Sequence, residues 1–120
     1  MQVCHSYGVV HRDLKLENVL FDSVAKTKIK VVDFGIAGLI TSCRADKNTA
    51  ATLKYMTPEM TFSNSVAAPP MDVWAIGIMA YVMLFNRVPF NGPTRKDIKT
   101  AIAEQEYKIP TSKVVSHDFQ

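Results

Sequence analysis

The feature that most constrains the fold is an apolar run at residues 73–85, VWAIGIMAYVMLF. The run is too short to span a bilayer, for which about 20 residues are needed. Because it is apolar nearly all round, it predicts a buried helix in the protein core. Two prolines at positions 69 and 70 fit the first turn of a helix, and Asp72 lies near the positive end of the helix dipole. We therefore expect a helix from about residue 68 to Phe85.

The segment before this helix has weaker patterns. Two runs with alternating and β-branched residues, NVLFD at 18–22 and KIKVVD at 28–33, predict a small β-hairpin. Between residues 35 and 64 the periodicity fades, and many small and polar residues predict a long loop. Loops of this length within a domain are usually functional or disordered.

A second helix is predicted over residues 95–107, where Ile98, Ala101 and Ile102 fall on one face. Pro110 ends this region, and the last residues, 112–120, could begin one more helix. Together these patterns predict an α+β fold that is mainly α-helical.

Composition excludes several classes of function. With 120 residues, 48% of them hydrophobic, the chain is long enough for one domain with a core. A net charge of +3 without a dense Lys/Arg tract argues against a nucleic-acid partner. Cys4 and Cys43 lack the CxxC spacing of zinc sites and fit a reducing compartment. We expect a cytoplasmic protein without a membrane span, and the nucleus is also compatible with these features.

A polar segment, HRDLKLEN at residues 11–18, lies between apolar flanks. Its spacing is H-R-D-x-x-x-x-N, with the fixed residues His11, Arg12, Asp13 and Asn18. Three further motifs follow in order: Asp33-Phe34-Gly35, Thr57-Pro58-Glu59 and Asp72-Val73-Trp74. Taken singly, such residues are more often surface ion pairs or turn caps. The ordered set is too specific to arise by chance.

This set resembles the eukaryotic protein kinases over essentially the whole chain. The resemblance implies a phosphotransferase that uses ATP and Mg²⁺ and acts on protein substrates. Asp13 would accept the proton of the substrate hydroxyl, and Lys15 would place an ammonium against the transferred phosphoryl group. Asn18 and Asp33 would supply the oxygen ligands that Mg²⁺ prefers, and with Lys15 they would contact ATP.

Finer features indicate serine/threonine specificity. Lys15 is typical of serine/threonine kinases, whereas tyrosine kinases usually have an arginine and alanines in this stretch. Thr52 matches a threonine that contacts the catalytic aspartate and lysine in this family. Ala51 and Thr57 depart from the family pattern GTxxYxAPE, which predicts altered loop geometry rather than lost chemistry. Glu17 matches an acidic position that binds an arginine upstream of the acceptor, so we expect a moderate preference for basic substrates.

The resemblance also implies regulatory residues. Arg12 is typical of kinases controlled by phosphorylation of the loop, because a guanidinium can bind a phosphate with two hydrogen bonds. Thr49 is the main candidate phosphosite, Ser42 and Thr41 are secondary candidates, and an ordinary loop threonine is the alternative for Thr49.

Structural roles fall to six residues: His11, Phe34, Gly35, Glu59, Asp72 and Trp74. Asp72 is expected to bind backbone amides of the HRD segment, and simple compensation of the helix dipole is the alternative. The family partner of Glu59 is an arginine that these 120 residues do not contain. Glu59 must therefore find another partner, be solvated or remain under-stabilised.

The resemblance covers only part of a kinase. No GxGxxG loop, VAIK-type lysine or partner glutamate precedes the HRD segment in these residues. We expect residues 1–120 to be a partial catalytic domain, with most of the large C-terminal lobe, a hairpin beside the catalytic loop and no N-terminal lobe.

Two functions are compatible with this pattern. The first is the catalytic segment of a serine/threonine kinase, inactive when isolated from the missing lobe. The second is a non-catalytic interaction or regulatory module. Within the kinases, the segment DVWAIGIMAYVMLFNRVPFNG resembles the calcium/calmodulin-dependent group, although no EF-hand pattern is present.

Overall fold

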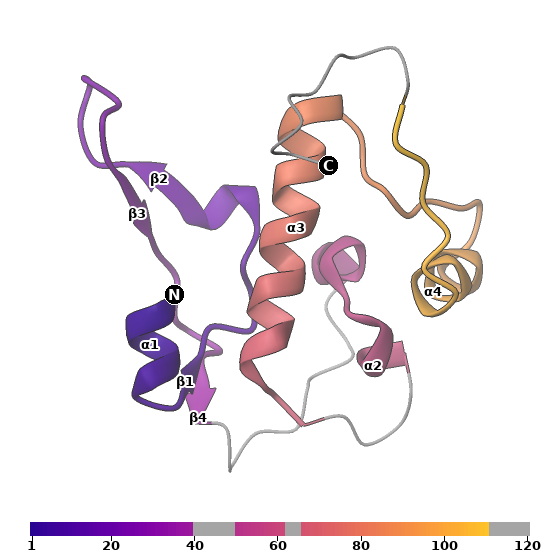
Figure 1. Cartoon of the computed structure of the whole chain (residues 1–120), viewed down its shortest axis with the longest axis horizontal. Helices are drawn as coiled ribbons and strands as arrows, with labels where there is room; N and C mark the ends of the chain where they lie inside the picture. Colours follow the sequence, from indigo (N-terminus) through magenta and orange to yellow (C-terminus); the bar gives the residue numbers. More distant parts are fainter. Residues whose placement is uncertain (40–49, 62–65, 111–120) are drawn as a thin grey trace.

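Helix α3 (Pro69–Phe85) is the central element of the fold (Figure 1). The structure, a computed structural model, describes residues 1–39, 50–61 and 66–110. Prolines occupy the first turn of α3, and the chain leaves the helix at Asn86, whose backbone is left-handed with φ 54°. The helix predicted from the apolar run is thus confirmed. No helix within the described ranges has the length and hydropathy needed to cross a membrane.

The larger core cluster joins α3 to η2 (Ala50–Tyr55), α2 (Pro58–Thr61) and α4 (Arg95–Ala103). Its buried side chains are Leu53, Met56, Met60, Ala67, Met71, Ile78, Phe90 and Ile102. A smaller cluster joins α3 to the loop at residues 11–18 through Leu14, Ala75 and Met79. The 11–18 loop is therefore anchored directly on the central helix.

Helix α4 is shorter than predicted. It begins at a capping box, in which the Thr94 hydroxyl accepts the Asp97 amide and Asp97 accepts the Thr94 amide. It ends at Ala103 instead of residue 107, because Gln105 adopts a left-handed backbone with φ 54°. The predicted buried face is confirmed, since Ile102 has no exposed surface and its helical neighbours pack against the same cluster.

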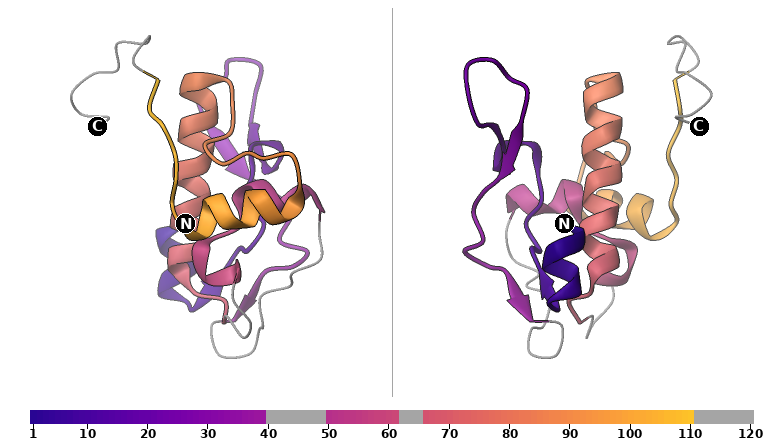
Figure 2. Two further views of the ribbon diagram at one scale, coloured as in Figure 1. Left: turned by 90° about the vertical axis from the view of Figure 1, so that its right-hand side faces the viewer. Right: turned by 60° about the vertical axis from the view of Figure 1, so that its left-hand side comes forward.

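Two small antiparallel sheets lie on one side of α3, and α2 and α4 lie on the other (Figures 1 and 2). β1 (Val9–Val10) follows α1 (Gln2–Ser6) and pairs with β4 (Gly38–Leu39). β2 (Val19–Phe21) follows η1 (Leu16–Asn18) and pairs with β3 (Ile29–Val31). The chain thus combines helices with small antiparallel sheets.

The described part of the predicted loop at residues 35–64 contains regular elements, and residues 40–49 and 62–65 of that prediction lie outside the described residues. The regular elements are β4, η2 and α2. These elements have two, six and four residues. Elements this short carry no detectable hydrophobic period, which explains why the sequence pattern missed them.

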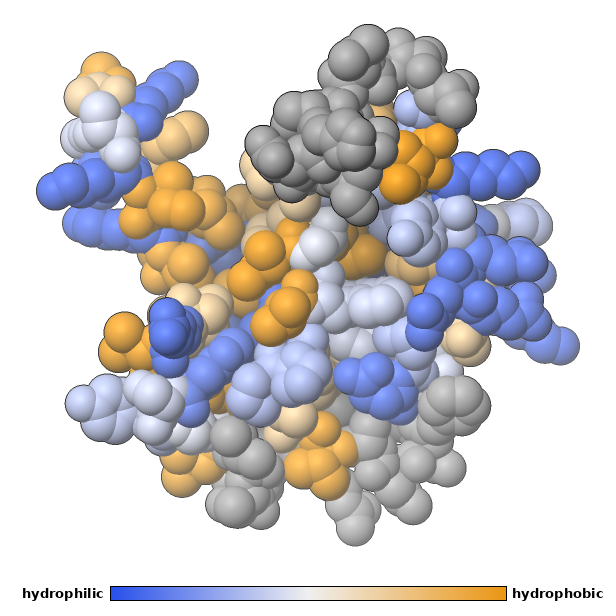
Figure 3. Space-filling view, in the orientation of Figure 1, coloured by the Kyte–Doolittle hydropathy of each residue, from blue (hydrophilic) through white to orange (hydrophobic). Residues whose placement is uncertain are grey.

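Part of the apolar surface is exposed, contrary to the prediction that α3 is buried nearly all round. Ile76 and Met83 of α3 are 42% and 68% exposed, because the described elements leave this side uncovered. Phe21 and Ile29 of the β2–β3 pair are also exposed. Figure 3 shows apolar surface over this region. The hairpin contributes to the core mainly through its base, where Val19 and its cross-strand partner pack on the smaller cluster.

Candidate active site

His11 joins the 11–18 loop to the segment that follows β3. Its side chain is fully buried, and Nε2 donates a hydrogen bond to the Val32 carbonyl oxygen at 3.0 Å. The other ring nitrogen, Nδ1, accepts the Asp13 amide at 3.3 Å. These two contacts require the tautomer with the proton on Nε2. The ring also packs on Phe34 with 4.5 Å between centroids, so two of the residues assigned structural roles lie together.

Asp72 binds the backbone of the same loop. Its carboxylate accepts the His11 amide at 2.9 Å and the Arg12 amide at 3.0 Å. Arg12 has a left-handed backbone with φ 70°, a conformation that costs a non-glycine residue energy. Asp72 is 1% exposed, so these charge-assisted bonds form away from water and stabilise the strained turn. Asp72 therefore binds two backbone amides of the loop directly, in addition to any compensation of the α3 dipole, which was the alternative role considered for it.

Asp13, Lys15 and Asn18 form one cluster on the loop. Lys15 Nζ donates to Asp13 Oδ2 at 2.7 Å. Asn18 Nδ2 donates to the Asp13 carbonyl oxygen at 2.8 Å and lies 3.4 Å from Asp13 Oδ2. Asn18 is buried, whereas the carboxylate and the ammonium are partly exposed. The arrangement fixes one carboxylate at the surface beside a cation and an amide.

The protonated form of the Lys15 side chain is stabilised by this cluster. The hydrogen bond to Asp13 is the main cause that raises the pKa of Lys15. Burial acts in the opposite direction, and the negative charges of Asp13, Glu17 and Asp33 add smaller upward effects. Lys15 therefore stays protonated through the neutral pH range, as an electrostatic role requires.

Asp33 offers a second oxygen donor near this cluster. It is exposed, has a left-handed backbone with φ 62°, and accepts the Gly35 amide on Oδ1 at 3.3 Å. The carboxylate of Asp33 and the amide oxygen of Asn18 are the kind of hard ligands that suit Mg²⁺. Residues 1–39, 50–61 and 66–110 contain no cluster of three or more His, Cys, Asp or Glu side chains.

The remaining residues that were predicted to have regulatory, substrate-binding or structural roles lie outside the Asp13–Lys15–Asn18 cluster or outside the described residues. Arg12 donates from Nη1 to the Ile36 carbonyl oxygen at 3.0 Å, so its guanidinium lies against the segment after β3. Glu17 and Glu59 are exposed, and of the outcomes considered for Glu59 the structure has the solvated one. Thr49 and the side chain of Thr52 lie outside the described part of the chain.

Trp74 belongs to the core on the other side of α3. Its ring stacks on Phe90 with 5.6 Å between centroids and 6° between planes. Trp74 also packs against the larger core cluster.

Two residues of this region were missed by the sequence reasoning. His5 contacts Asp72, with 2.7 Å between Nε2 and Oδ2. Tyr55 packs on the smaller cluster, and burial is the main cause that raises its pKa. His5 belongs to none of the motifs discussed above, whereas Tyr55 occupies the tyrosine position of the GTxxYxAPE pattern, to which no site role was assigned.

The stability of the chain is expected to fall as pH rises above about 10. The ordinary pKa values are 10.5 for Lys15 and 10.0 for Tyr55, and both are raised in the folded chain. A raised folded-state pKa means that the folded chain binds more protons than the unfolded chain in this range. The contribution of these groups to stability is therefore complete at pH values below the unfolded-state pKa. It is lost as the pH rises through the folded-state pKa. Urea unfolding between pH 7 and 11 measures this.

Lys15→Met and Tyr55→Phe are each expected to flatten the alkaline decline, and the double variant should flatten it most. Lys54→Met, at an exposed lysine in η2, is the matched control. An alkaline decline of the same steepness in wild type and double variant would contradict the assignment.

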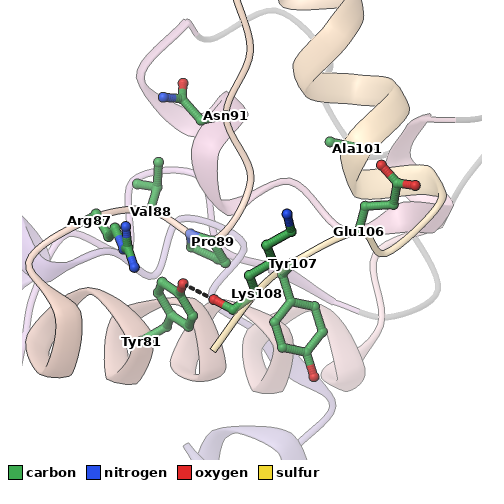
Figure 4. Close-up of a pocket in the computed structure, with 9 residues that line it drawn as sticks. All are labelled: Tyr81, Arg87, Val88, Pro89, Asn91, Ala101, Glu106, Tyr107 and Lys108. Carbon is green, nitrogen blue, oxygen red and sulfur yellow. Dashed lines mark hydrogen bonds between the residues drawn. The ribbon is translucent and has the colours of Figure 1, made fainter. Parts of the chain in front are cut away.

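A pocket of about 790 Å³ lies away from this cluster (Figure 4). It is lined by residues from the end of α3, the loop after it and the segment around α4: Tyr81, Arg87, Val88, Pro89, Asn91, Ala101, Glu106, Tyr107 and Lys108. The Tyr81 hydroxyl donates to the Lys108 carbonyl oxygen at 2.5 Å and ties two of these segments together. None of the residues predicted to form the site lines this pocket.

Comparisons with known proteins agree with the geometry. The family model described as "Protein kinase domain" matches residues 1–120. NUAK family SNF1-like kinase 1 of Mus musculus is 36% identical over 108 residues, which are 90% of this chain and 16% of that protein. Sucrose non-fermenting protein kinase 1 of Fusarium virguliforme is 34% identical over 110 residues, 92% of this chain and 16% of the relative. Serine/threonine-protein kinase SIK2 of Gallus gallus is 33% identical over 110 residues, again 92% of this chain and 14% of the relative.

Proposed function

Because this chain belongs to the protein kinase family, we propose that it is the catalytic segment of an SNF1-related serine/threonine kinase. Its relatives in the comparison are serine/threonine kinases of the SNF1-like and SIK types. The observation that carries the proposal is the cluster on the 11–18 loop, where Asp13 lies between Lys15 and Asn18. A scaffold protein has no chemical need for this arrangement.

In the proposed reaction Asp13 is the proton acceptor. Its partly exposed carboxylate would take the proton from the hydroxyl of the protein substrate and orient the oxygen for attack. Asn18 holds the Asp13 carbonyl oxygen and thereby fixes the loop around the carboxylate. Pre-organisation of this kind lowers the cost of orienting the reactants.

Lys15 supplies the positive charge. Its ammonium, kept protonated by Asp13, would stabilise negative charge on the group being transferred. Asn18 and Asp33 would hold Mg²⁺. ATP with its Mg²⁺ would supply the phosphoryl group and neutralise part of its charge.

The substrate class follows from the resemblance and is part of the proposal. Lys15 favours serine or threonine acceptors, and the exposed Glu17 carboxylate is available to bind a basic residue upstream of the acceptor. Regulation through phosphorylated Thr49 and the Arg12 guanidinium belongs to the same proposal. Mass spectrometry of the active protein tests it, and unmodified Thr49 would exclude it.

The chain spans about one sixth of the length of the curated relatives named above. We propose that residues 1–120 correspond to most of the large lobe of the kinase domain, and that the isolated chain lacks measurable activity and binds ATP weakly or not at all. Its residues contain no glycine-rich phosphate loop and no strand lysine of the VAIK type.

A chimera tests the function. In it, this chain replaces the matched segment of mouse NUAK family SNF1-like kinase 1, which supplies the remaining parts of a kinase. We expect transfer of radiolabelled phosphate to a serine/threonine peptide, with a loss of at least about a hundredfold in Asp13→Asn.

Asp22→Asn, at an exposed aspartate outside the cluster, is the matched control and should retain activity. Circular dichroism and thermal unfolding establish that each chimera is folded. A folded chimera without transfer would contradict the kinase proposal and favour a non-catalytic module. Turnover by the isolated chain that disappears in Asp13→Asn would contradict the proposed inactivity of the fragment.

A further inference from the structure

The turn of the β2–β3 hairpin carries apolar side chains on the surface. Val24 lies in this turn and is 98% exposed. Phe21 and Ile29, which are cross-strand partners next to the turn, are 58% and 64% exposed. Figure 1 and the right-hand view of Figure 2 show the turn projecting away from α3. A projecting group of apolar side chains is a common mark of an interaction surface.

Three exposed lysines, Lys26, Lys28 and Lys30, lie next to these apolar side chains. The Lys26 ammonium lies over the Phe21 ring, with 5.8 Å between Nζ and the ring centroid. Lys30 pairs with Leu20 and, because side chains alternate along a strand, lies on the face opposite to Phe21. None of the three lysines forms an ion pair with a side chain in the described part of the chain. Positive charge is therefore available on both faces of the hairpin.

This positive charge is not balanced within the hairpin. Asp22 is the only acidic residue in the sequence from 19 to 31, so the three lysines exceed the acidic charge by two. A lysine stem is long and flexible, and its ammonium can reach toward an anionic surface while the stem covers apolar neighbours. The hairpin thus combines an apolar tip with cations around it. These two features together bind proteins to the surface of anionic membranes.

The placement of the lysines favours a membrane over other partners. A peptide that binds beside β3 would contact one face of the hairpin and leave the charge on the other face in water. A flat anionic surface that meets the turn end-on contacts Val24 first and receives lysines from both faces. A second copy of the chain would bring the same positive charges together, which is unfavourable.

We propose that the β2–β3 hairpin attaches the chain to membranes that contain anionic lipids. Val24 would enter the headgroup region first, and the lysines would bind the phosphate and carboxylate groups of the lipids around it. The attachment is reversible, because three lysines and a small apolar tip give only weak binding. It uses none of the residues assigned to phosphate transfer and occurs with or without that reaction.

Cosedimentation of the 120-residue chain with lipid vesicles tests the proposal. The vesicles contain phosphatidylcholine alone or with about one third phosphatidylserine, at an ionic strength of about 0.1 M, where charges act over about 10 Å. We expect binding to the anionic vesicles to be at least about tenfold tighter than to the neutral ones. The triple variant Lys26→Gln/Lys28→Gln/Lys30→Gln should lower the partition coefficient at least about thirtyfold, because each lysine near an anionic surface contributes about fivefold.

The matched control removes the same charge from another part of the chain. Lys54→Gln/Arg95→Gln/Lys96→Gln changes three exposed cations of η2 and α4, and should lower the partition coefficient by less than about threefold. Val24→Ser tests the apolar tip and should lower the coefficient about fivefold, because the methyl groups that leave water on insertion are lost. All these side chains are exposed, and circular dichroism establishes that each variant is folded.

Three outcomes would contradict the proposal. The first is equal binding to neutral and anionic vesicles, and the second is an equal loss in the two triple variants. The third is binding to a soluble peptide of alternating glutamate and valine without binding to anionic vesicles. In that case the hairpin would be a docking surface for an acidic protein, and the membrane proposal would be wrong.

Discussion

Replacement of Asp72 by alanine is expected to lower the free energy of unfolding by about 3–5 kcal/mol. The side chain is buried and accepts from the His11 amide, the Arg12 amide and the His5 ring. Alanine would leave these groups without an acceptor, and buried donors that lose their partner cost their full desolvation. Urea unfolding followed by circular dichroism measures the change.

The control is Asp22→Ala, at an exposed aspartate, which should change stability by less than about 0.5 kcal/mol. Asp72→Asn retains one acceptor oxygen and should give an intermediate loss. If Asp72→Ala unfolds within about 1 kcal/mol of wild type, the loop amides must find other acceptors, and the support assigned to Asp72 is refuted.

Replacement of Phe90 by alanine is expected to cost about 3–5 kcal/mol. Phe90 is 3% exposed and lies between two rings, stacked on Trp74 and in edge contact with Tyr107 at 6.1 Å between centroids. Alanine would remove the contacts of both rings and leave a cavity beside α3. Equilibrium unfolding in urea gives the size of the loss.

Phe21→Ala is the matched control for this substitution, because its ring is 58% exposed on the hairpin. It should cost less than about 1 kcal/mol. Phe90→Leu, which refills most of the cavity, should fall between the two. Equal losses for Phe90→Ala and Phe21→Ala would mean that the larger cluster is not the main core of the chain.

Periodicity predicted the long elements because a buried face repeats over several turns. The apolar run around Ile78 and the spacing of Ile98 and Ile102 therefore located α3 and α4. The end of α4 was placed too late, because the left-handed backbone at Gln105 leaves no signal in the hydrophobic pattern. The exposed side of α3 was also missed, since an apolar pattern states which residues can be buried and not what covers them.

The site was predicted through motifs rather than through periodicity. Asp13, Lys15 and Asn18 lie within six residues of one another, and the motif that contains them, through its resemblance to the protein kinases, predicted a joint role; in the structure they are in contact. The contact of Asp72 with the loop spans about 60 residues and was suggested only by the family resemblance. His5 had no such signal, because an unremarkable helix residue acquires its partner only in the folded chain.

The β2–β3 pair has a consequence for association between copies. In the part of the chain that is described, this sheet has only two strands, so each strand presents an open hydrogen-bonding edge next to exposed apolar side chains. Such edges are templates for intermolecular pairing and for aggregation. Lysines at positions 26, 28 and 30 occupy the turn and β3, where a strand from another copy would bring the same charges into register. Charged side chains at a strand edge oppose edge-to-edge pairing, so we expect these lysines to disfavour assembly through this edge.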